Sequence, residues 1–122
     1  MFLVVKNEEL DDTKIRVINF KNITQFIVAP LGNYSDNNFV IQAEIETPNR
    51  VARIFLSSKY KPFETMEDAY QALKSMLELM SFIEKRGGNF YNITIYDLRS
   101  AEEKEDKEED DIETVLRRKT IM

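Results

Sequence analysis

Short runs of apolar residues, several of them alternating with polar ones, dominate the first half of this chain. Runs that are rich in Val, Ile, Phe and Tyr and bounded by Asn, Asp, Gly or Pro are typical of β-strands. One further run of this kind begins near residue 90, after a long segment that mixes polar and apolar residues. The pattern predicts strands at residues 2–6, 15–20, 23–29, 39–47, 50–58 and 90–97.

The strands at 39–47 and 50–58 give the clearest hairpin signal. Between them, Pro48 and Asn49 occupy the two central positions of a β-turn. A register in which paired residue numbers sum to 97 puts Glu44 directly opposite Arg53, and a one-residue slip would turn one apolar set to the other face. In this register one face carries Phe39, Ile41, Ala43, Ile45, Ala52, Ile54 and Leu56, and the opposite face is mixed in polarity, as expected for a partly covered face or a subunit contact.

Apolar residues recur at spacings of three and four between residues 69 and 83, which is the period of an amphipathic helix. Thr65 with Asp68 three positions later resembles a capping box, and Gly87-Gly88 suits the left-handed backbone of a helix end. The pattern predicts a helix over residues 65–86. Its apolar stripe consists of Ala69, Leu73, Met76, Leu77, Met80 and Ile83, widened by Tyr70, Leu79 and Phe82.

A series of strands followed by one helix is typical of the α+β class, in which the helix covers one face of an antiparallel sheet. We therefore predict a single small α+β domain over residues 1–100, with an antiparallel sheet of about five to six strands and one long amphipathic helix on one face. The strand order outside the hairpin stays open.

The composition limits the chemistry of this domain. The chain has 122 residues, enough for one domain, and it contains neither Cys nor His. Disulfides, thiol nucleophiles, Cys/His zinc sites and the commonest general base are therefore excluded. The net charge of −5 argues against a nucleic-acid binder held by phosphate contacts. We predict no catalytic residues, no metal and no cofactor.

The sequence also bears on where the protein acts. It has no secretory signal pattern, and no apolar run approaches the roughly 20 residues that span a bilayer. We expect a cytoplasmic protein that does not insert into membranes.

Carboxylates are the remaining candidates for an enzyme. Asp11 and Asp12 lie in a polar loop and could help to hold a divalent cation. Glu44 and Glu46 point the same way from one strand, as paired catalytic carboxylates would. The plainer interpretations are a solubilising loop and a surface ion pair between Glu44 and Arg53.

The connector between the hairpin and the helix is a candidate anion site. A helix N-terminus with nearby lysines and serines favours negative charge, although this connector lacks the glycines of a phosphate-binding loop. An ordinary connector with solvated lysines is the competing interpretation. If the protein binds a nucleotide-like ligand, we expect the contacts to come from Arg53, Lys59, Tyr60 and Lys61.

The last segment, residues 101–122, is a charged tail. It holds nine acidic and five basic side chains, and the acidic ones come first, as the dipole of a helix favours. Because its apolar cluster is small, a solvated helix and a segment that orders only on a partner are equal alternatives. The end of the tail is a candidate docking segment that consists of Ile112, Val115, Leu116, Arg117 and Arg118.

Three functional hypotheses follow. The first is a non-enzymatic interaction protein that binds another macromolecule, a protein rather than a nucleic acid, as an inhibitor or accessory factor. The Asn-, Ile-, Lys- and Glu-rich composition of the chain is similar to that of small single-domain accessory proteins of phages and mobile elements. The alternative is a homo-oligomeric binder of a small anionic ligand, and the third is a carboxylate- and metal-dependent enzyme.

Overall fold

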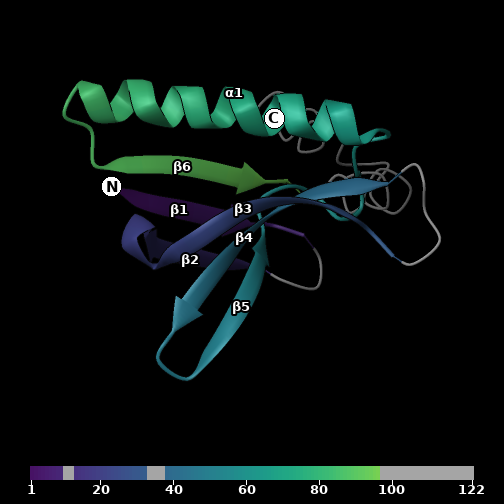
Figure 1. The fold of residues 1–122 in the computed structure, drawn as a ribbon, viewed down its shortest axis with the longest axis horizontal. Coiled ribbons are helices and arrows are strands. Elements are labelled where there is room, and N and C mark those ends of the chain that lie inside the picture. Colours follow the sequence, from purple (N-terminus) through teal and green to yellow (C-terminus); the bar gives the residue numbers. More distant parts are fainter. Residues whose placement is uncertain (10–12, 33–37, 97–122) are drawn as a thin grey trace, which may run out of the picture.

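The computed structural model describes residues 1–9, 13–32 and 38–96. Over these residues the chain forms six strands, one 3-10 turn and one long helix, an α+β arrangement as predicted (Figure 1). The elements are β1 (Phe2–Asn7), β2 (Lys14–Asn19), η1 (Phe20–Asn22), β3 (Ile23–Pro30), β4 (Phe39–Thr47), β5 (Arg50–Phe55), α1 (Met66–Lys85) and β6 (Phe90–Ile95).

The strands form two sheets, so the prediction of a single antiparallel sheet is wrong. One sheet has the order β2-β1-β6 and the other the order β3-β4-β5, and β6 runs parallel to β1. The division occurs at η1, where the Asn19 side chain accepts a hydrogen bond from the Lys21 backbone N–H at 3.0 Å. This cap redirects the chain, so β3 leaves the first sheet instead of extending it.

The parallel pairing comes from the return of the chain after α1. The Phe2 N–H donates to the Asn89 carbonyl at 2.7 Å, just before the β1–β6 ladder begins. Parallel neighbours require a long crossover connection, and here the second sheet and α1 lie between the two strands in the sequence.

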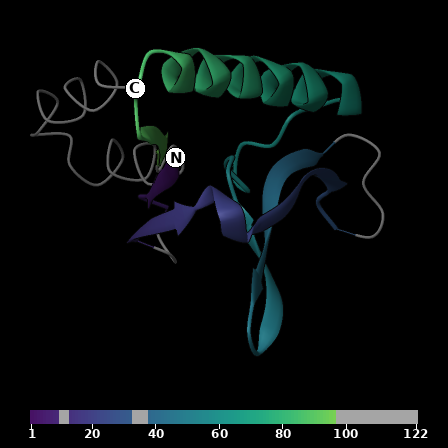
Figure 2. The same ribbon diagram turned by 60° about the vertical axis from the view of Figure 1, so that its left-hand side comes forward.

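The predicted hairpin register is confirmed. Glu44 lies opposite Arg53 and Ala43 opposite Ile54, and β5 ends at Phe55, earlier than the predicted residue 58. At the turn, the Thr47 hydroxyl accepts from the Arg50 N–H at 3.3 Å and donates to the Arg50 carbonyl at 2.9 Å. The β4–β5 hairpin projects away from α1 (Figures 1 and 2).

Helix α1 agrees closely with its prediction. The Thr65 hydroxyl accepts a hydrogen bond from the Asp68 N–H at 3.0 Å, and Gly87 takes a positive φ of 83° after the last turn. Ala69, Leu73 and Met80 are buried. Leu77 of the predicted stripe is instead exposed, and so are the residues that widened the stripe, Tyr70, Leu79 and Phe82.

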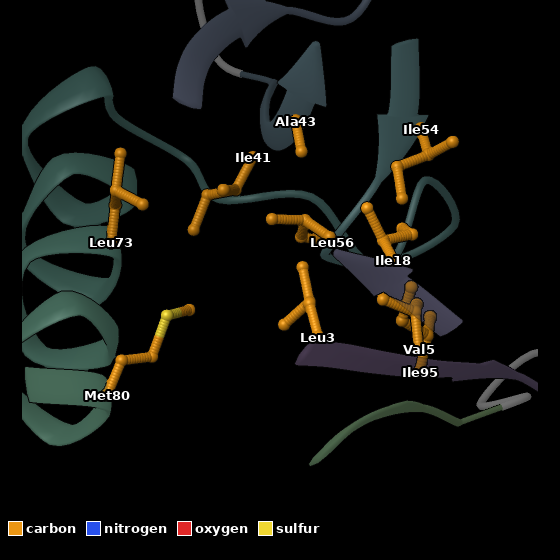
Figure 3. Close-up of a cluster of buried hydrophobic side chains, with 10 residues drawn as sticks. All are labelled: Leu3, Val5, Ile18, Ile41, Ala43, Ile54, Leu56, Leu73, Met80 and Ile95. Atoms are coloured by element: carbon orange, nitrogen blue, oxygen red, sulfur yellow. The ribbon is translucent and has the colours of Figure 1, made fainter. Parts of the chain in front are cut away.

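The core lies where the inner faces of both sheets meet α1. Side chains from all three layers point toward one another in Figure 3. The two sheets and the helix therefore share one hydrophobic core. Its buried members are Leu3, Val5, Ile18 and Ile95 from the first sheet, Ile41, Ala43, Ile54 and Leu56 from β4, β5 and the residue after it, and Leu73 and Met80 from α1.

Candidate interaction surface

The first sheet turns an apolar face to the core and a face of mixed polarity to the outside. Along β1, Leu3 and Val5 are buried, and the alternation of a strand therefore directs Phe2, Val4 and Lys6 to the opposite face. In β2, Ile18 is buried, whereas Ile15 and Val17 are exposed on that opposite face.

The strand register joins these outward residues into one patch. Phe2 pairs with Phe90 across the parallel ladder, and their rings stack with centroids 5.6 Å apart. Val4 lies opposite Val17 on the antiparallel side. We call this patch the open face, and it consists of Phe2, Val4, Ile15, Val17 and Phe90.

The open face is accessible to solvent. Ile15 is 66% exposed, Val17 61% and Phe90 54%. Large exposed apolar groups gathered in one place are typical of surfaces that bind another macromolecule, whereas scattered ones need no explanation. The patch borders charged residues, since Lys6 pairs with Glu8 at 3.1 Å. It also reaches both edge strands of the sheet, β2 and β6.

The residues predicted for an anionic ligand make different contacts in the structure. The Lys59 ammonium lies 5.2 Å from the centroid of the Tyr60 ring, and the Lys61 N–H donates to the Ser58 hydroxyl at 3.0 Å. Arg53 has a different partner, because its Nε donates to Glu44 Oε2 at 3.2 Å. Lys59 and Tyr60 thus lie together, while Arg53 belongs to a cluster on the β3-β4-β5 sheet.

Glu44 is the centre of that second cluster. Gln25 Nε2 donates to Glu44 Oε1 at 3.1 Å, and the Thr24 hydroxyl lies 3.2 Å from the same oxygen. Hydrogen bonds from Gln25, Arg53 and Thr24 lower the pKa of Glu44 below its usual value of 4.5, because they stabilise the ionised carboxylate. These donors favour the ionised carboxylate, and the ion pair between Glu44 and Arg53 is present as the sequence predicted.

A pocket of about 170 Å³ opens between α1 and the N-terminal residues. Its lining is mostly apolar, and Glu84 is its one acidic group. Negative charge at its wall does not suit the predicted anionic ligand. The lining residues are Met1, Phe20, Leu77, Met80, Ser81 and Glu84.

Several predicted features lie outside the described residues. Asp11 and Asp12 are among them, as are all five candidate docking residues of the tail at positions 112 and 115–118. Within residues 1–9, 13–32 and 38–96, no three carboxylates are grouped in a way that could hold a metal ion. In the same ranges, no helix has both the length and the apolarity needed to cross a bilayer.

Sequence reasoning missed the open face. Residues 2–5 are apolar at every position, so alternation does not separate an inner from an outer face there. The exposed Ile15 and Val17 alternate with Arg16 and the buried Ile18, so neither face of this strand is cleanly polar in the sequence. Only the pairing of β1 with both β2 and β6 brings the outward residues together.

Comparison of the whole chain with known protein families, with curated proteins and with solved structures finds no significant match.

Proposed function

We propose that this chain is a non-enzymatic interaction protein that binds another protein through the open face of the β2-β1-β6 sheet. The observation that carries the proposal is the exposure of Ile15, Val17 and Phe90 on one sheet face that has no covering layer among the described residues. Burying such groups on a partner removes apolar area from water, which favours association by about 25 cal/mol per Å² before the costs of binding.

Two further features support a protein partner. The patch is built on paired strands, so its side chains are held in place before binding and little backbone entropy is lost. The stacked Phe2 and Phe90 rings supply the aromatic anchor that is common at the centre of protein interfaces.

The alternative, binding of a small anionic ligand, gains no support from the contacts that Arg53 and Lys59 make. Arg53 is hydrogen-bonded to Glu44, and Lys59 lies over the Tyr60 ring. A melting-temperature screen with nucleotides measures this alternative directly, and a rise with an anionic ligand would favour it over the open-face proposal.

The test is a tagged pull-down from cells of the native host with a matched pair of variants. Val17→Lys places a charge on the open face, whereas Val51→Lys places the same charge on an equally exposed valine of β5, since the two side chains are 61% and 59% exposed. We expect Val17→Lys to lose the proteins that the wild type captures and Val51→Lys to keep them. Equal capture by both variants would contradict the proposal.

A further inference from the structure

Helix α1 carries exposed apolar side chains that are not part of the open face. Leu79 is 47% exposed and Phe82 is 52% exposed. At about 100° per residue, both project from a different side of the helix than Tyr70 and Leu77, and neither lies on the buried stripe of Ala69, Leu73 and Met80.

These two residues belong to a regular series along the helix. Its members are spaced by four, three, four, three and four residues, the heptad spacing of a helix–helix contact. Two positions of the series hold small residues and two hold large apolar residues. Each end of the series holds one charged residue. We call it the helix seam, and it consists of Asp68, Ala72, Ser75, Leu79, Phe82 and Arg86.

The helix seam is complementary to itself when two copies run antiparallel. In that alignment Phe82 of one copy faces Ala72 of the other, and Leu79 faces Ser75. Each layer thus combines one large and one small side chain, which is how packed helix layers fill space without clashes.

The charges favour the same orientation. Asp68 of one copy faces Arg86 of the other, and this pair occurs twice because the contact is two-fold symmetric. A parallel alignment would instead bring Asp68 against Asp68 and Arg86 against Arg86. The Arg86 guanidinium already lies over the ring of Phe82, another seam residue, at 4.5 Å, so its position is restrained before any partner binds.

We propose that the helix seam binds a second copy of this chain, with the two α1 helices antiparallel and Asp68 of each copy paired with Arg86 of the other. The dimer leaves the open face available and goes beyond the proposed function. The test of the helix seam and the test of the open face can therefore fail independently of each other.

Charge reversal of the full-length chain tests the pairing. Asp68→Lys and Arg86→Glu each place like charges together twice per dimer, and we expect each to weaken dimerisation by about tenfold or more in sedimentation equilibrium. The double variant restores opposite charges, and we expect it to recover the dimer even though its helix dipole is less well matched. Failure of the double variant to dimerise better than both single variants overturns the proposal.

The apolar layers are tested by a matched pair on the same helix. Leu79→Glu removes a seam residue, and Tyr70→Glu makes the same kind of change on the other side of α1, where Tyr70 is 50% exposed. We expect only Leu79→Glu to give a monomer. A wild type that stays monomeric up to about 1 mM overturns the proposal, as does equal weakening by both variants.

Because the chain has no cysteine, disulfide trapping reports the geometry cleanly. Mixing Ser75→Cys protein with Leu79→Cys protein under mild oxidation is expected to give a mixed crosslinked dimer, since these positions face each other across the seam. Lys74→Cys mixed with Glu78→Cys is the control, with the same spacing one residue away from the seam. Equal crosslinking of the two mixtures would reject the antiparallel alignment.

Discussion

Glu44 concentrates hydrogen bonds at a single residue. It accepts from Gln25, Thr24 and Arg53, which come from two different neighbouring strands. Because all three donors favour the ionised form, the folded state binds the Glu44 proton less tightly than the unfolded state does. The residue therefore links the stability of the β3-β4-β5 sheet to pH.

The sign of this linkage gives a prediction. Since the pKa of Glu44 is lowered on folding, its contribution is present above pH 4.5 and is lost as the pH falls through the folded pKa. We expect Glu44→Gln to have a lower free energy of unfolding than the wild type near neutral pH. In acid, we expect this gap between the variant and the wild type to become smaller. Urea denaturation at about pH 7 and about pH 3 measures both, with Glu46→Gln on the same strand as the control. A gap that does not narrow in acid would contradict this account.

At the scale of the element, α1 shows which of its features depend on local interactions and which on tertiary contacts. Its start at Thr65 and its end before Gly87 agree with the prediction because each depends on hydrogen bonds within five residues. Which apolar residues are buried depends instead on the surfaces that approach the helix. The apolar arc is wider than the contact with β3, β4 and β6, so its flanks are left for other partners.

The cap at Thr65 gives the prediction for this element. Thr65→Ala removes the acceptor of the Asp68 N–H and leaves that donor to water, so we expect a loss of about 1 kcal/mol in the free energy of unfolding. Thr65→Ser keeps the hydroxyl and serves as the control. Chemical denaturation followed by circular dichroism measures both variants. An alanine variant as stable as the serine variant would show that the cap contributes nothing here.

For the whole molecule, the decisive feature is that the inner faces of two sheets and one helix share a core. Leu3 is fully buried and points toward Leu56 and the helix side chains (Figure 3). It lies on β1, the central strand of the first sheet, while Leu56 directly follows the second sheet. A change at Leu3 therefore acts on every layer at once.

We expect Leu3→Ala to lower the free energy of unfolding by about 2–5 kcal/mol, because it leaves a cavity where all layers meet. Unfolding followed by tyrosine fluorescence and by far-ultraviolet circular dichroism is expected to give coincident transitions, since neither sheet has a core of its own. Val17→Ala, on the exposed side of the same sheet, is the control and should change stability by less than about 0.5 kcal/mol. Two separate transitions would show that the sheets fold independently.

The amino-acid pattern was sufficient for the features that depend on near neighbours. The α1 boundaries follow from Thr65 and the paired glycines, and the β4–β5 register follows from alternation across a short turn. The division into two sheets, the parallel β1–β6 pair, the open face and the exposed flanks of α1 could not be predicted in this way. These features arise from contacts between segments far apart in the chain, and runs such as residues 2–5, apolar on both sides, carry no contrast from which to choose a partner.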